Sequence, residues 1–425
     1  MKKQILPLFF LLSSATLSFA QKLSPIEAKI IAQVNAQMPQ TEAILKKVVN
    51  INSGTLNHEG VREVGAIFRK EFDDLGFKTE WVSLPDSLNR AGHLVAERKG
   101  TKGKKLFLIG HLDTVFEKAM SFTPYTYLND STVTGQGVND MKGGDVVLLA
   151  ALKSLKDNGL LDDTSLTIYF TGDEESSGKP TSVSRKDFID RAKKCDIALA
   201  FETAIGLNTV ATARRGSSGW KLNVKGIMGH SSTVFSQQAG YGAIYEAARI
   251  LNDFREQMSH EKYLTFNPGL IVGGSEINDN KEAIGKDNII SPRVSVTGDL
   301  RFLTETQKEN ARAKMREIVS KNLNKTKAEI TFQDGIPAME PTAENEKILA
   351  VLNQVSLDLG FGEVKAGDPG SRGAGDISYI AKYVACLDGL GASGKGAHAP
   401  GETMNIKEFP KLVQRTALLI YRLTR

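Results

Sequence analysis

The chain has 425 residues, which is too long for one ordinary hydrophobic core and predicts about two domains. Its hydrophobic share of 41% and charged share of 24% are typical of a soluble globular protein. The net charge of +5 is small for this length, and Lys and Arg are scattered along the chain. We therefore expect no nucleic-acid partner and no membrane partner.

The first twenty residues have the pattern of a secretory signal peptide. Lys2 and Lys3 precede an apolar run over residues 5–12, and small residues suited to cleavage occur near Ala20. An uncleaved anchor would need about 20 apolar residues, and this run is shorter. We predict that residues 1–20 are removed and that the protein is secreted or periplasmic. In that compartment Cys195 and Cys386 form either a disulfide or two buried free thiols.

Apolar periodicity predicts alternating helices and strands in the mature chain. Helical spacing covers residues 23–49 and 59–75, with Gly76 placed to end the second helix. Strand-like runs follow at 78–84, 93–98 and 105–110. This order predicts an α/β fold.

Two adjacent carboxylates, Glu174 and Glu175, follow the predicted buried strand 166–170. Neighbouring side chains on a strand point to opposite faces, so these two can share one site only where the backbone turns. A turn at the carboxyl end of a strand is where open α/β sheets bind their ligands. Taken alone, the segment is better interpreted as a solvated acidic loop, and the partners along the rest of the chain reverse that preference.

Further histidines and carboxylates follow other predicted strands or glycine-rich turns. Each has an ordinary alternative: His111 and Asp113 as a surface pair, Asp140 as a helix N-cap, and Glu202 as a single acidic residue at a strand end. His398 follows the predicted strand 383–391. Two histidines and four carboxylates in one α/β half are the ligand types that a two-metal site requires.

Seven motifs, spread over nearly the whole mature chain, resemble those of the dinuclear zinc hydrolases of the M20 metallopeptidase family, and most of all its glutamate carboxypeptidase branch. They are INSGT (51–55), GHLDTVF (110–116), GVNDMKGG (137–144), TGDEESSG (171–178), AFET (200–203), GHSS (229–232) and GAHAPGE (396–402).

This resemblance implies two Zn²⁺ per chain. His111 and Glu202 would bind one zinc, Glu175 and His398 the other, and Asp140 would bridge the two, with a cis peptide following it. Glu174 would be the general base, and Asp113 would orient His111. The resemblance also implies a zinc-peptidase-like mixed sheet with helices on both faces.

A second domain interrupts the first. The predicted order β-α-β-β-α-β over residues 214–333 is the ferredoxin-like α+β pattern, and it resembles the lid and dimerisation domain of the family. The first domain then consists of residues 21–213 and 334–425. The resemblance implies a homodimer through this lid and site roles for His230, Asn288 and Arg301. The other histidines, His58, His93 and His260, match no family position and are expected on the surface.

We expect an exported zinc hydrolase that cleaves an amide bond next to a C-terminal amino acid with a free carboxylate. This describes a carboxypeptidase acting on a small peptide or N-acyl amino acid, and glutamate is one candidate for the released residue. The glutamate-releasing branch often carries a basic side chain near Gly335, where this chain has Asp334 and Ile336. An N-acyl amino acid deacylase or a dipeptidase would use the same site. A catalytically silent binding module is a further alternative, against which the presence of Glu174 argues.

Overall fold

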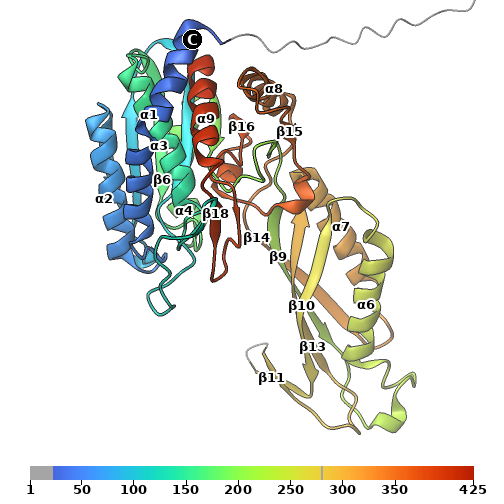
Figure 1. Cartoon of the computed structure of the whole chain (residues 1–425). Coiled ribbons are helices and arrows are strands. Elements are labelled where there is room, and N and C mark those ends of the chain that lie inside the picture. Colours follow the sequence, from blue (N-terminus) through green and yellow to red (C-terminus); the bar gives the residue numbers. More distant parts are fainter. Residues whose placement is uncertain (1–22, 279–280) are drawn as a thin grey trace, which may run out of the picture.

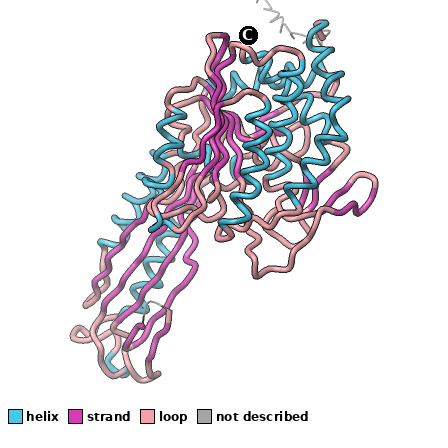
Figure 2. The backbone as a smooth tube through the Cα atoms, turned by 90° about the vertical axis from the view of Figure 1, so that its left-hand side faces the viewer, coloured by secondary structure: helices cyan, strands magenta, loops and turns pink. Residues whose placement is uncertain are grey.

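The structure, a computed structural model, describes residues 23–278 and 281–425, so the predicted signal peptide lies outside the described residues. Two units are visible in Figure 1. The large unit comprises residues 23–213 and 335–425, and the small unit comprises residues 214–334. The small unit extends away from the large one as an elongated lobe, which the rotated view in Figure 2 also shows.

A six-stranded sheet forms the centre of the large unit. Four neighbouring strands at one side pair in parallel, while the second strand from the other edge pairs antiparallel with both of its neighbours, so the sheet is mixed as predicted. In spatial order the strands are β1 (Lys78–Val82), β2 (His93–Arg98), β6 (Thr164–Thr171), β3 (Lys102–His111), β7 (Ile197–Ala200) and β16 (Ala385–Leu387).

Alternating side chains of this sheet enter two separate cores. Leu106 and Leu108 belong to the larger core, whereas Phe107 and Ile109 belong to the smaller core on the opposite face. Helices on both faces therefore bury the sheet, which confirms the predicted class (Figure 1). They are α1 (Pro25–Val49), α2 (His58–Asp74), α3 (Lys142–Asp157), α8 (Ala343–Asp358) and α9 (Phe409–Leu423) around the larger core, and α4 (Thr181–Ser184) and α5 (Lys186–Ala192) near the smaller one.

Local sequence explains where the first helices begin and end. Ser24 and Glu27 form a reciprocal capping box that starts α1. Gly76, directly after the C-cap residue of α2, has φ +82°, which favours glycine. No helix among the described residues combines the length and apolarity that crossing a membrane requires.

The small unit has its own sheet and its own core. Its four strands pair antiparallel in the order β10-β13-β9-β14, as in the ferredoxin-like pattern, and α6 and α7 pack on one face. The elements are β9 (Gly216–Lys225), α6 (Gly242–Met258), β10 (Thr265–Gly274), β13 (Arg293–Phe302), α7 (Glu305–Ser320) and β14 (Lys327–Asp334), with a short hairpin of β11 (Glu276–Asn278) and β12 (Glu282–Ile284).

Short strands connect the loops around the large sheet. One antiparallel group is β17 (Gly394–Lys395), β18 (Thr403–Asn405), β5 (Thr132–Thr134) and β4 (Thr126–Asn129), and β8 (Thr209–Val210) pairs with β15 (Lys365–Ala366). Because β18 pairs with β5, the segment around His398 is attached to the segment that leads to Asp140.

Two expectations about single side chains are resolved by the packing. His93 is completely buried, so the prediction of a surface position is wrong. Its ring accepts the Gly172 N–H at Nδ1, and Nε2 lies 3.2 Å from the Ser184 carbonyl oxygen, so the interior supplies partners for both nitrogens. Cys195 and Cys386 are both free thiols in the described part of the chain.

Candidate metal centre

The five predicted metal ligands lie together at one end of the large sheet. His111 ends β3, while Glu175 and Glu202 follow β6 and β7, its two parallel neighbours. The carboxyl ends of parallel neighbours meet at one edge, which explains why these three side chains converge. Asp140 lies in the turn before α3, and His398 lies in the loop between β17 and β18.

Asp140 stands between the two histidines. Its Oδ1 lies 3.3 Å from His111 Nε2, and its Oδ2 lies 3.1 Å from His398 Nε2. Glu202 Oε1 is 3.7 Å from His111 Nε2, and Glu175 Oε2 is 3.1 Å from His398 Nε2. Two triads therefore share Asp140, and the ligand atoms of each triad lie within 4.8 Å of one another.

The environment of His111 fits a bound cation. Its Nδ1 lies 3.0 Å from the backbone carbonyl of Asp113, so the geometry assigns the ring proton to Nδ1 and a lone pair to Nε2. Nε2 is buried without a hydrogen-bond partner among the described residues and faces the carboxylates of Asp140 and Glu202. A lone pair facing two carboxylates is repelled unless a positive ion lies between them. Imidazole and carboxylate ligands of this kind suit zinc and related divalent metals.

The carboxylates of the site lack sufficient positive charge from the protein. Burial, reinforced by Asp140, raises the pKa of Glu202 to about 7, and burial with the nearby Glu202 raises the pKa of Glu174 well above its usual value. Hydrogen bonds to Asp140 and Glu175 raise the pKa of His398 to about 11. Each shift shows that the site favours added positive charge, which two divalent cations would supply.

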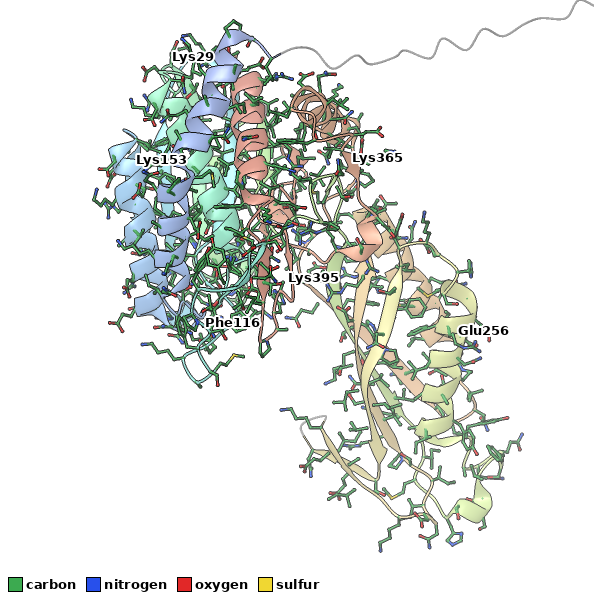
Figure 3. All side chains as sticks on the ribbon, in the orientation of Figure 1. Lys29, Phe116, Lys153, Glu256, Lys365 and Lys395 are labelled. Atoms are coloured by element: carbon green, nitrogen blue, oxygen red, sulfur yellow. The ribbon has the colours of Figure 1, made fainter. Side chains whose placement is uncertain are left out.

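His398 belongs to an exposed loop, although its ligand atom faces the interior. Its side chain is 59% exposed, and its backbone has φ +64°, a left-handed conformation that is uncommon outside glycine. Figure 3 shows Lys395, three residues earlier, on the side of the large unit that faces the small unit. The loop that carries His398 therefore begins on the side of the large unit that faces the small unit.

The Asp113 side chain makes contacts beyond the predicted one to His111. Its carboxylate accepts the backbone N–H groups of Glu174 and Glu175 at 3.0 and 3.1 Å, and the Thr55 hydroxyl at 2.6 Å. The Asp113 carbonyl oxygen, and not its carboxylate, makes the closest contact to His111 Nδ1, because the carboxylate oxygen lies at 3.5 Å. Asp113 thus positions both the His111 ring and the backbone that carries the two glutamates.

A cavity of about 700 Å³ adjoins Glu174 and Glu175. One wall comes from residues 174–181 of the large unit, and the other comes from the end of the small unit, including Ser217 and Asp334. Side-chain hydroxyls, amides and charges make up much of the lining. The cavity places a polar substrate within reach of Glu174.

A buried ion-pair network supports the loop of the two glutamates. Arg185 is completely buried and donates to Asp173 at 2.5 Å and to Asp376 at 2.7 Å. Asp376 also accepts the hydroxyl of Thr171 at the end of β6, and Asp173 accepts the Gly178 N–H. The network therefore fixes both ends of the turn that presents Glu174.

Arg185→Met should lower the free energy of unfolding by about 3–5 kcal/mol, because it leaves two carboxylates buried without their cation. Urea denaturation with and without the substitution measures this loss. The adjacent Lys186→Met is the matched control, since Lys186 pairs with Asp190 on the surface and its loss should change the unfolding midpoint little. Equal midpoints for wild type and Arg185→Met would show that the network is not needed for stability.

The structure separates the predicted site residues of the small unit. His230 and Asn288 lie together, because Ser231 donates its N–H to the Asn288 carbonyl at 2.9 Å. Arg301 pairs in register with Ser217 near the start of β9, and its guanidinium donates to Asp299 at 2.6 Å. The thirteen residues from Asn288 to Arg301 run largely along β13, which spans about 3.4 Å per residue. Within one chain, Asn288 and Arg301 are therefore too far apart to bind one substrate carboxylate together.

Sequence reasoning missed three buried side chains that shape the site. Arg214 pairs with Asp388 and lies near enough to Glu202 and Glu174 for these carboxylates to raise its pKa. Arg185 has no sequence signal of its own. Glu402 could have been found, because it ends the same short motif as His398.

The comparisons with known proteins agree with this geometry. The model of peptidase family M20/M25/M40 matches residues 107–422. Carboxypeptidase G2 of Pseudomonas sp. (strain RS-16) is 27% identical over 394 residues, which cover 90% of this chain and 89% of that protein.

Solved structures show the same fold. Aminopeptidase PepT from Bacillus cereus has a TM-score of 0.73 at 18% identity, covering 93% of this chain and 99% of that one. The YXEP protein of Bacillus subtilis, described as a dinuclear metal-binding peptidase of the M20 family, has a TM-score of 0.64 at 13% identity, covering 92% and 99%. The matched family model spans most of the chain and both predicted ligand triads, and this chain belongs to peptidase family M20/M25/M40.

Proposed function

We propose that this protein is an exported, zinc-dependent carboxypeptidase that releases a C-terminal amino acid from a small peptide or N-acyl amino acid. The observation that carries the proposal is the pair of ligand triads sharing Asp140, with Glu174 beside them on the cavity wall. The similarity to carboxypeptidase G2 supports the type of bond, and the signal-like residues 1–20 support export.

Each triad supplies one imidazole, one terminal carboxylate and one oxygen of Asp140, which leaves room for a further ligand at each zinc. When bound, two zinc ions would polarise the scissile carbonyl and acidify water between them. Three carboxylates offset most of the positive charge of two divalent ions, so the buried site accepts both.

Glu174 carries the proton in this mechanism. Its side chain lines the cavity and belongs to neither ligand triad, so it is free to exchange a proton with water or substrate there. Glu174 removes a proton from the attacking water as the new C–O bond forms, and gives that proton to the amide nitrogen as the C–N bond breaks. The Asp113 carboxylate accepts the backbone N–H of Glu174, so the Glu174 side chain is positioned before the substrate binds.

His230 is too far from the metal centre to act on it within one chain. β9 leaves the large unit at Gly216 and ends at Lys225, and a ten-residue strand spans about 33 Å. β9 runs along the small unit away from the large one (Figure 1), and His230 follows its last residue by five positions. Its predicted role therefore requires a second copy of the chain, whose His230 and Asn288 would complete this active site.

The surface of the small unit supports such a dimer. β10 is an edge strand of its sheet, and Leu270 and Ile271 on it are 42% and 54% exposed. Ile244 and Tyr245 on the adjacent α6 are each 53% exposed. An unpaired edge beside exposed apolar side chains favours pairing with a second copy. We propose a homodimer in which the two β10 strands and the two α6 helices meet.

Arg301 is the proposed partner of the substrate carboxylate at the near end of the small unit. A guanidinium binds a carboxylate through two parallel hydrogen bonds, so Arg301→Ala should raise KM for free acids and leave reaction of C-terminal amides little changed. Paired kinetic measurements on an acid and its amide test this. Equal losses on both substrates would assign Arg301 to its ion pair with Asp299 instead.

The released amino acid is set by the cavity, where Asp334 is the acidic residue contributed by the small unit. The Arg312 guanidinium binds Asp334 at 2.6 Å, so this cation is already paired and is not free to bind the side-chain carboxylate of a glutamate. Release of glutamate, deacylation of N-acyl amino acids and dipeptide hydrolysis remain the alternatives to separate. A panel of N-acyl amino acids and dipeptides with varied C-terminal residues, assayed with added zinc, tests the proposal. Failure to cleave any free-acid substrate would contradict it.

A further inference from the structure

We propose that Glu402 is a positioning residue that fixes the Asp140 carboxylate between the two metal positions. This inference rests on the proposed dinuclear site and adds a residue that neither binds metal nor touches substrate. Glu402 follows His398 by four residues and directly precedes β18.

The side chain of Glu402 binds three backbone amides of the Asp140 turn. Its Oε2 accepts the Gly137 N–H at 2.9 Å, and its Oε1 accepts the N–H groups of Asn139 and Asp140, each at 2.7 Å. The residue is 2% exposed. A buried backbone N–H needs a hydrogen-bond acceptor, which a helix or strand normally supplies. These three N–H groups lie outside any helix or strand, so the Glu402 carboxylate is their acceptor instead.

The chemistry of glutamate suits this position better than that of its neutral analogue. Two oxygens without any N–H can face three donors, whereas glutamine would direct an NH₂ group at one or two of them. One of the donors is the N–H of Asp140 itself, so the contact acts on the residue whose two oxygens must face His111 and His398. A rotation of this backbone would turn both oxygens away together.

Glu402 is itself held firmly. Its carbonyl oxygen accepts the Thr134 hydroxyl at 2.7 Å, and its N–H donates to the Ala399 carbonyl at 3.2 Å. The next residue, Thr403, pairs with Thr134 in the β18–β5 ladder. The Glu402 side chain therefore extends the β18–β5 connection to the Asp140 turn itself, and a change there affects the ligand that both metals share.

The proposal predicts a distinctive effect on metal binding. Glu402→Gln should lower the affinity for each of the two zinc ions by about 10–100-fold, because the ligand that both ions share is misplaced. His398→Ala should weaken chiefly the equivalent that His398 binds. Competition between a chelator and the metal-free protein for added zinc measures the two zinc affinities directly, without relying on activity. Glu344→Gln, at the exposed start of α8, is the control for the loss of a glutamate charge.

Unchanged zinc affinities in Glu402→Gln would overturn the proposal, and so would weakening of one equivalent alone, which would confine Glu402 to the His398 loop. Glu402→Asp, which keeps both oxygens on a shorter stem, is the second variant. If the metal-free wild type folds but neither variant does, as judged by circular dichroism, Glu402 is a folding residue and the proposal fails. Wild-type protein that does not bind two zinc ions would contradict the proposed function itself, which separates the two failures.

Discussion

Glu174→Gln is expected to lower kcat by about 10²–10⁴-fold while both zinc ions stay bound. Glutamine keeps the size and polarity of the side chain but cannot accept the proton of the attacking water. Glu174 is outside both ligand triads, and its backbone is held by Asp113 through a bond that the substitution leaves intact. Steady-state kinetics together with metal analysis of the purified variant check both parts of the prediction.

The adjacent Glu175→Gln is the matched comparison, since it changes the same functional group one residue further along. Glu175 Oε2 lies 3.1 Å from His398 Nε2 within a ligand triad, so this variant should lose affinity for one metal. Loss of metal in Glu174→Gln, or full metal retention in Glu175→Gln, would show that the roles of the two glutamates are reversed.

His230→Ala is expected to reduce turnover by about 10²–10³-fold with the zinc content unchanged. In the proposed dimer, His230 of one copy donates a hydrogen bond to the oxyanion that forms on the substrate in the other copy. Within its own chain, His230 Nδ1 lies 2.8 Å from the Ser232 hydroxyl. This contact orients the ring and leaves Nε2 to donate to a group on the other copy. Kinetics and metal analysis of the same preparation measure the effect.

Mixing two inactive variants tests whether the site is shared. When His230→Ala and Glu174→Gln chains are dissociated and reassociated, a mixed dimer has one active centre with both an intact Glu174 and an intact His230. Activity should then return in proportion to the mixed dimer. If mixed dimers form, as shown by differently tagged chains, and activity does not return, His230 acts within its own chain or only shapes its turn.

Much of the fold follows from local patterns in the sequence. Period-two apolarity along residues 166–170 marks β6, and helical spacing with Gly76 at its end marks α2. The ligand types could also be predicted, because His111, Glu175 and Glu202 each follow an apolar strand, and neighbouring parallel strands bring their ends together.

Long-range packing determined what could not be predicted. His93 begins β2, and its burial comes from contacts to Gly172 and Ser184, which lie 79 and 91 residues further along the chain. Arg185 meets Asp376 across 191 residues, and Glu402 meets Asp140 across 262 residues, so no local pattern contains these pairs. Asn288 and Arg301 are near in sequence but extended structure separates them.

Zinc titration of metal-free protein is the most direct test of the central claim that two metals sharing Asp140 drive amide hydrolysis. The account predicts that chelation abolishes cleavage of an N-acyl amino acid, that activity returns as zinc is added, and that binding saturates at about two ions per chain. Asp140→Asn should weaken both equivalents in the same titration, since Asp140 belongs to both triads. Full activity of the metal-free protein, or saturation at one ion per chain, would contradict the account.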